Sequence, residues 1–225
     1  MNWVDFFIGV VLIIAISVGY KRGIFKELST FLGLVAGTIV AFNYADLVAI
    51  KAEGFVNIAP SLRYVFSFVI CFIATLLVFK LVGYYFYKMV KLSKLGVSDK
   101  LGGAVFGALK GLAILSLIFL MFMFFPAFQS FNQAIDDSVM APYIRQFIPF
   151  TYDYSSFLHP KSGKFIGKVS AGILGSEGAE YASNPEKLLS KGEELGFSAD
   201  DVRVLNNIDK YFGEKVEVAA KGAEK

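Results

Sequence analysis

The sequence predicts an all-α, polytopic membrane protein with four transmembrane helices packed through faces of glycine and other small residues, plus a short helical C-terminal tail. Hydrophobic residues make up 56% of the 225 residues and charged residues 18%, whereas soluble domains average roughly 45–50% and about 25%. A soluble domain of this size has too little interior for that excess. The hydrophobic residues gather in four long stretches without a polar face, which disfavours a soluble helical bundle. The single cysteine, Cys71, excludes a disulfide-stabilised secreted domain.

The charges divide the chain into an apolar, basic part and a polar, slightly acidic part. Residues 1–150 contain 12 Lys and Arg against 7 Asp and Glu, whereas residues 151–225 contain 10 against 12. We therefore expect a four-helix transmembrane domain over residues 1–125, an interfacial amphipathic segment over 126–150, and a polar extracytoplasmic tail over 151–225. The net charge of +3 is too small to indicate a nucleic-acid partner.

The four predicted spans cover about residues 3–20, 28–42, 64–87 and 101–125. A helix needs roughly 17–25 mostly apolar residues to cross a bilayer, so the second span is short unless Ile24 and Phe25 extend it. The third contains Lys80, whose side chain can snorkel to the interface. The first is not a cleaved signal peptide, because Asp5 precedes it and the basic residues Lys21 and Arg22 follow it.

The basic residues between the spans predict the orientation. Seven lie in the loops after the first and third spans, whereas three lie on the opposite side, at Lys51, Arg63 and Arg145. The positive-inside rule therefore places the first and third loops in the cytoplasm. Both termini are then extracytoplasmic.

Small residues at four-residue spacing predict where the helices touch, because close backbone approach drives helix association in lipid. They recur on three of the four spans, and we interpret them as packing positions: Gly19 and Gly23 on the first, Gly33 and Gly37 on the second, and Gly103, Gly107 and Gly111 on the fourth.

Lys110 is the main candidate for a functional charge. It lies eleven residues after Asp99, about 16 Å along the fourth helix, on the same face as the glycines. A charge at that depth is costly and marks a functional site by default. Two structural interpretations compete with a function: Lys110 snorkels towards the cytoplasm, or it pairs with Glu27 near the start of the second helix. Asp5, at the opposite interface, is expected to be a helix cap or anchor. Arg22, at the end of the first span, is the fourth candidate charge.

The sequence offers no arrangement for catalysis or cofactor binding. His159 is the only histidine and precedes Pro160, which disfavours a zinc cluster or a histidine-based triad. Cys71 lies in an apolar span and is expected to be an inert core residue. We therefore expect a protein that is not an enzyme and that uses no cofactor or metal.

Three segments resemble the colicin V production (CvpA) family. The first hairpin has Asp5, Gly19, Arg22-Gly23 and Glu27; the fourth span begins SDKLGGAVFGALKGL; and DDSVMAPYIRQFIP follows it. The resemblance covers about residues 1–150, with Lys110 where the family often has arginine, so a strict guanidinium role is not expected there. It implies a four-helix protein of the bacterial inner membrane that supports toxin production or export, or envelope homeostasis. It implies no reaction, substrate or cofactor.

The tail is expected to contain short helices. We predict an interfacial helix between Pro126 and Pro149, a helical hairpin over about 184–213, and disorder over 214–225. The expected partners are the lipid bilayer, unidentified membrane or envelope proteins and a second copy of the chain. The alternative function is a small channel or transporter subunit whose path is lined by Lys110 and Glu27.

Overall fold

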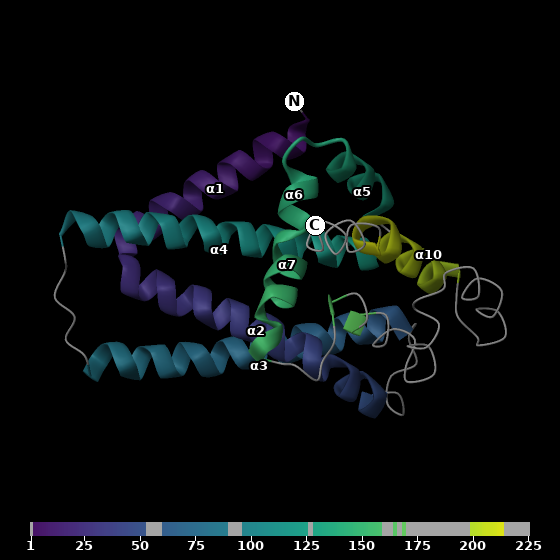
Figure 1. Ribbon diagram of the computed structural model, residues 1–225, viewed down its shortest axis with the longest axis horizontal. Helices are drawn as coiled ribbons and strands as arrows, with labels where there is room; N and C mark the ends of the chain where they lie inside the picture. Colours follow the sequence, from purple (N-terminus) through teal and green to yellow (C-terminus); the bar gives the residue numbers. More distant parts are fainter. Residues whose placement is uncertain are drawn as a thin grey trace, which may run out of the picture.

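The computed structural model describes residues 2–52, 60–89, 96–125, 128–158, 164–165, 168–169 and 199–213. All of the regular elements in these ranges are helical (Figure 1). The long helices are α1 (Trp3–Arg22), α2 (Ile24–Ala52), α3 (Pro60–Met89) and α4 (Val97–Phe124). The short ones are α5 (Gln129–Asp136), α6 (Ala141–Arg145), α7 (Phe147–Tyr154), the 3₁₀ turn η2 (Ser155–Leu158), α10 (Ala199–Ile208) and the π-helical turn η3 (Asp209–Gly213).

Each long helix is long and apolar enough to cross a membrane, which confirms the four predicted spans. The qualifying segments are Trp3–Arg22, Ile24–Ala49, Ser61–Tyr85 and Val97–Phe124. The second differs most from its predicted range, because α2 runs from Ile24 to Ala52 rather than over residues 28–42. Ile24 and Phe25 are its first two residues, and only Gly23 separates it from α1. The chain is a multi-pass membrane protein.

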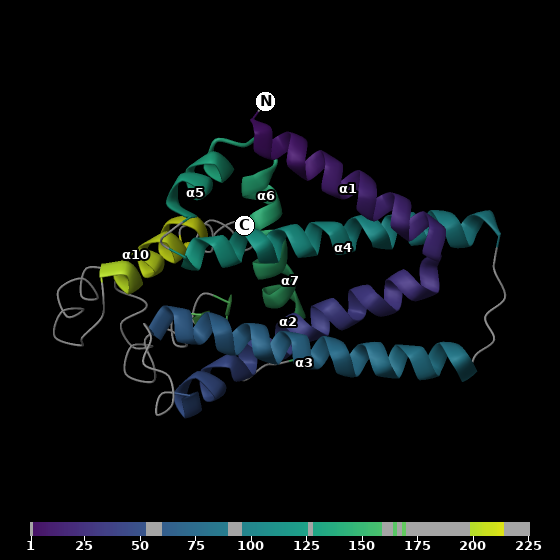
Figure 2. The same cartoon turned by 180° about the vertical axis from the view of Figure 1, so that it is seen from behind.

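The long helices form two pairs that meet through α2 and α4. Helix α1 packs along α4 and α2 packs along α3, whereas α1 and α3 have few contacts outside their own pairs. Seen from behind, the order across the molecule is α1, α4, α2, α3 (Figure 2). Large apolar side chains cover the outer face of α3, including Ile70, Leu77 and Leu81, as expected for a surface that meets lipid.

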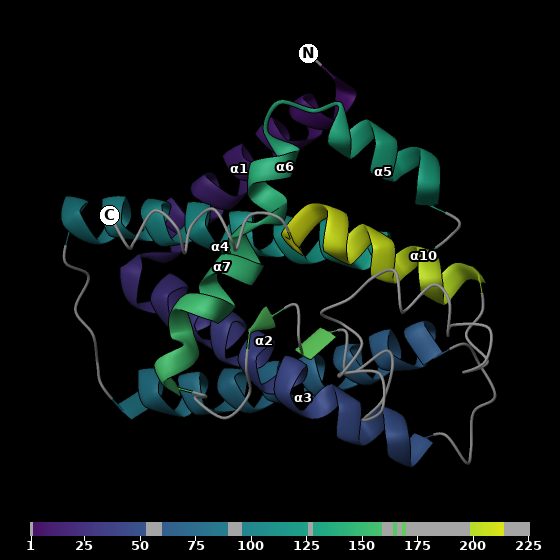
Figure 3. The same ribbon diagram turned by 45° about the vertical axis from the view of Figure 1, so that its right-hand side comes forward.

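The chain folds back over the bundle after α4. Helices α6 and α7 run across α4, and α7 reaches α2 (Figure 3). The range between Pro126 and Pro149, where one interfacial helix was expected, thus contains α5, α6 and the start of α7. The buried side of this segment includes Ile144 and Ile148, whereas Tyr143 and Phe150 are exposed.

Part of the tail packs on the end of the bundle that holds the C-terminus of α4. Val204, Ile208 and Phe212, from α10 and η3, are buried in one cluster with Phe42 of α2 and Phe165. The second helix of the predicted hairpin corresponds to α10 and η3. Its first helix, over about 184–196, lies outside the described residues, as does the segment 214–225.

Candidate functional site: buried charges between the long helices

Glycine brings the backbones of α1 and α4 into direct contact. A Cβ atom built on Gly19 would lie 2.2 Å from the carbonyl oxygen of Gly103, and one on Gly107 would lie 2.5 Å from that of Ala15. Real Cβ atoms do not approach backbone this closely, so no larger residue fits without separating the helices. Gly111 continues the same face, where a Cβ would lie 2.8 Å from the Ala15 methyl. These glycines place α1 against the N-terminal half of α4.

The glycines of α2 face the other pair. A Cβ on Gly33 would lie 3.1 Å from the Phe79 Cβ, and one on Gly37 would lie 3.3 Å from the Phe72 ring. Phenylalanine side chains of α3 therefore occupy the space above these two glycines. The contact between α2 and α3 is thus made by side chains on glycine rather than by backbone on backbone.

A one-residue turn joins α1 to α2 and is held by α4. Gly23 has φ +83°, a backbone conformation that side chains disfavour, and a Cβ there would lie 2.3 Å from an Asp99 carboxylate oxygen. The same carboxylate accepts a 3.0 Å hydrogen bond from the Ile24 N–H, one of the unpaired donors at the start of α2. Asp99 of α4 thereby caps α2 and fixes its first turn.

That first turn carries Glu27, which forms an ion pair with Lys110 of α4. Glu27 is fully buried and Lys110 is 9% exposed. Lys110 therefore pairs inside the bundle rather than snorkelling. Arg22 approaches the other carboxylate oxygen, with Nη1 3.6 Å from Glu27 Oε1, and its own side chain is 56% exposed. The structure thus brings together three of the four charged residues singled out in the sequence.

Positive groups surround the Glu27 carboxylate. Its carboxylate lies in the first turn of α2, where the helix dipole is positive, and two cationic side chains face it. Glu27 Oε1 nevertheless has no hydrogen-bond partner among the described residues. The arrangement can hold α2 against α4, and it contains one buried carboxylate oxygen with spare capacity to accept a hydrogen bond.

Asp5, the fourth charged candidate, lies at the opposite end of α1 and holds the segment between α5 and α6. Its carboxylate accepts hydrogen bonds from Ser138 Oγ at 2.6 Å and from the Met140 N–H at 3.1 Å. It also accepts the Asn2 N–H at 3.1 Å, so it closes the first turn of α1 as well. Asp5 therefore anchors a later part of the chain to the N-terminus of α1.

Ser116 and Arg145 are buried polar residues that the sequence analysis did not single out as sites. Ser116 Oγ donates to the Arg145 carbonyl and accepts the Ile148 N–H, both at 3.0 Å. It therefore satisfies the backbone groups that are freed where α6 ends and α7 begins. The sequence feature that could have indicated this role is the hydroxyl of Ser116, which interrupts the apolar run of α4.

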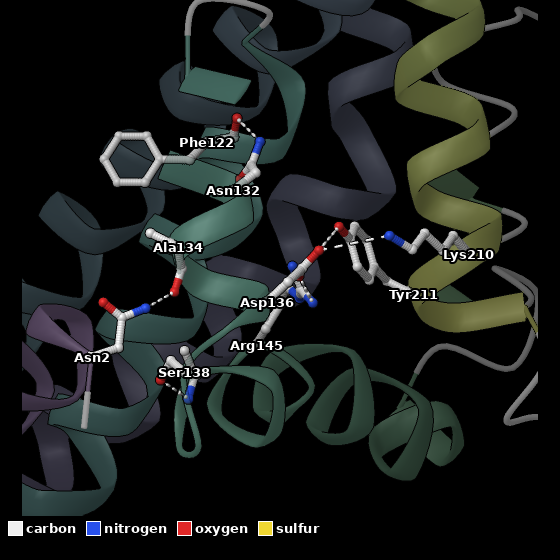
Figure 4. Close-up of polar contacts among 10 residues, drawn as sticks. Asn2, Phe122, Asn132, Ala134, Asp136, Ser138, Arg145, Lys210 and Tyr211 are labelled. Carbon is white, nitrogen blue, oxygen red and sulfur yellow. Dashed lines mark hydrogen bonds and ion pairs between the residues drawn. The ribbon is translucent and has the colours of Figure 1, made fainter. Parts of the chain in front are cut away.

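The Arg145 side chain belongs to a second group of charges, centred on Asp136 of α5. Arg145 Nη2 lies 2.9 Å from Asp136 Oδ1, Lys210 Nζ lies 3.7 Å from Oδ2, and the Tyr211 hydroxyl donates to the same carboxylate (Figure 4). The Tyr211 ring also stacks 3.6 Å from the Arg145 guanidinium carbon. Burial, followed by the hydrogen bond to Asp136, raises the pKa of Tyr211, so its hydroxyl remains a donor at neutral pH.

The described residues contain no group of three or more His, Cys, Asp or Glu that could hold a metal ion. Cys71 is half-buried on α3, and His159 lies outside the described residues. The charged groups at both ends of the bundle contact other parts of the same chain. Their geometry suits holding helices together.

Comparison with known proteins identifies relatives. The model of a family described as "Colicin V production protein" matches residues 4–149. A protein of Escherichia coli (strain K12), also described as "Colicin V production protein", is 28% identical over 118 residues, which cover 52% of this chain and 72% of the relative. No solved structure matches the chain. The matched range contains the residues of the glycine contacts and of the Glu27–Lys110 pair, together with Asp5 and Arg145.

Proposed function

Because the chain belongs to the colicin V production family, we propose that it is a non-enzymatic protein of the bacterial inner membrane that supports the production or export of a peptide toxin. The same role extends to envelope homeostasis, and the protein acts through membrane or envelope partner proteins rather than by a reaction of its own.

One observation carries this proposal: the main polar groups inside the bundle are engaged with one another. Glu27 contacts Lys110, Asp5 accepts from Ser138, and Ser116 bridges α6 and α7. These contacts join α2 to α4, α1 to the segment between α5 and α6, and α4 to α6 and α7. Side chains used in this way support a scaffold whose outer surfaces are available to partners.

The distribution of basic residues supports the orientation that belongs to this proposal. Lys21, Arg22 and Lys26 lie at the α1–α2 turn, and Lys100 lies at the start of α4. This end faces the cytoplasm by the positive-inside rule. Helix α10 and the α5–α7 segment then lie on the extracytoplasmic side, where an exported toxin or an envelope partner would be met.

A test uses the bacterium that encodes the protein. Deletion of its gene should lower the amount of active peptide toxin in the medium and should sensitise the cells to a detergent. Re-expression of the chain should restore both, and crosslinking in cells should capture partners on the extracytoplasmic side. Unchanged toxin output and unchanged detergent tolerance after deletion would contradict the proposal.

The buried charges favour one alternative, a channel or transporter subunit. Glu27 and Lys110 lie inside the bundle, and buried charges in membrane helices often line ion or substrate pathways. In this alternative, purified protein in liposomes conducts ions or small solutes, and Lys110→Ala abolishes the flux. The scaffold proposal expects no flux above that of empty liposomes.

A further inference from the structure

A pocket of about 170 Å³ lies where the end of α4 meets α5, α10 and η3. Its apolar side includes Met123, Phe125 and Val204, and its polar side includes Asn132, Asn207 and Lys210. A water molecule occupies about 30 Å³ of the liquid, so the pocket has room for a group of several non-hydrogen atoms. It is half apolar and half polar, as a site for an amphipathic molecule should be.

The charges around the pocket favour an anion. Arg203 and Lys210 line it, and the acid that lines it, Asp136, is already engaged by Arg145 and by the Tyr211 hydroxyl. Lys210 contacts Asp136 at 3.7 Å but keeps 66% of its side chain exposed. Since an ammonium has three donors, Lys210 can bind a phosphate oxygen without releasing Asp136.

Asn132, which also lines the pocket, has a buried hydrogen-bond acceptor. Its amide nitrogen donates to the Phe122 carbonyl at 3.2 Å (Figure 4), whereas its Oδ1 is buried and has no hydrogen-bond partner among the described residues. An unsatisfied buried acceptor is unfavourable. A ligand that carries an N–H or O–H close to its anion would satisfy it.

The pocket lies at the depth of lipid head groups. Counted from Lys100 near the start of α4, about 20 residues at 1.5 Å each cross the hydrocarbon core, which places its far boundary near Leu120. Met123 and Phe125 therefore lie just beyond that boundary, where phosphates of the nearby leaflet are found. This depth suits the head group of a membrane lipid.

We propose that the pocket binds the head group of a phospholipid in which a hydrogen-bond donor follows the phosphate, as in ethanolamine or glycerol head groups. The phosphate contacts Lys210, and the ammonium or hydroxyl donates to Asn132 Oδ1. The first carbons of the lipid lie against Met123 and Phe125. Choline lipids bind poorly, because their quaternary ammonium has no N–H to donate.

The test measures lipid binding to the full-length protein. Native mass spectrometry of protein that has been delipidated and then titrated with ethanolamine, glycerol or choline phospholipids should show retention of the first two only. Lys210→Met should weaken retention roughly tenfold, the usual effect of losing a charged hydrogen bond. Lys164→Met is the matched control, because Lys164 is exposed and lies outside the pocket lining; it should retain lipid like the wild type.

A second variant separates binding from folding. Asn132→Leu removes the acceptor but preserves the approximate size of the side chain. It should abolish the preference for ethanolamine and glycerol over choline lipids and leave helix content unchanged by circular dichroism. A merely structural role for Asn132 would not alter a lipid preference, so an unchanged preference overturns the proposal.

A final arm identifies the source of the phosphate. Soluble O-phosphoethanolamine carries the same head-group chemistry without acyl chains. If bound lipid is displaced only by a large excess of this compound, the result supports a phospholipid as the ligand of the pocket. Binding of the soluble compound with no retained lipid overturns the lipid assignment, and so does equal retention of choline lipid or equal loss in the Lys164→Met control.

Discussion

Glu27 and Lys110 show how a membrane bundle keeps two opposite charges in its interior. Each offsets part of the penalty of burying the other, and the first turn of α2 adds a positive helix dipole beside the carboxylate. The pair joins α2 to α4 across 83 positions of sequence. Both members are needed, because a single buried charge without a partner destabilises the fold far more than the pair does.

A double-mutant cycle tests this coupling. Lys110→Met alone and Glu27→Gln alone should each lower the free energy of unfolding in detergent by about 3–5 kcal/mol, because each leaves a buried group unpaired. The double change should recover part of that loss. Thermal unfolding of the four proteins measures it. If the two losses simply add, the residues are not coupled.

The position of Lys110 beside Glu27 could be proposed from the sequence, whereas the roles of Ser116 and Asn43 could not. Lys110 and Glu27 are isolated charges on apolar helices, so each suggests the other as its partner. Asn43 lies just beyond the predicted second span, which ended at residue 42. The structure pairs it with the Tyr152 hydroxyl at 2.9 Å. That contact exists only after α7 has folded back across the bundle.

At the scale of elements, the α1–α4 contact depends on two backbones that share one glycine-lined surface. The spacing of Gly103, Gly107 and Gly111 indicated a packing face on α4, and the structure places that face against Ala15 and Gly19. Local spacing could not have shown how α5, α6 and α7 return over α4. Their path depends on distant contacts, such as the Asp5 carboxylate with the Met140 N–H.

Two alanine substitutions on α1 distinguish this contact from a general effect of glycine. Gly19→Ala should destabilise the protein by about 1–3 kcal/mol, the usual effect of overpacking, because its Cβ would overlap the Gly103 carbonyl oxygen. Gly9→Ala is the control, since nothing lies within 4 Å of a Cβ there, and it should be neutral or slightly stabilising. Thermal unfolding in detergent compares them; equal losses would show that the backbones do not touch.

At the scale of the whole molecule, the two helix pairs place their polar connections at opposite ends. The α1–α2 turn and the start of α4 form one end, and α10 packs at the other. This separation makes the orientation in the membrane testable with one cysteine at each end.

Ser98→Cys and Asn206→Cys, each in a Cys71→Ala background, should label differently in intact cells. Both positions are exposed, at the start of α4 and on α10 respectively. A membrane-impermeant thiol reagent should modify the cysteine at 206 in intact cells and the one at 98 only after the cells are broken. The reverse labelling pattern would show that the orientation is opposite to the one predicted.

The most direct test of the scaffold account is toxin output from cells that carry the Glu27→Gln/Lys110→Met double variant. We assume that the pair serves only to hold α2 against α4. The active toxin in the medium, normalised to the amount of folded protein in the membrane, should then match the wild type within about twofold. A change of that size is well below the tenfold change in an equilibrium constant that corresponds to about 1.4 kcal/mol. A double variant that is folded and present in the membrane but supports no toxin output would contradict the account and would assign the two charges a direct function.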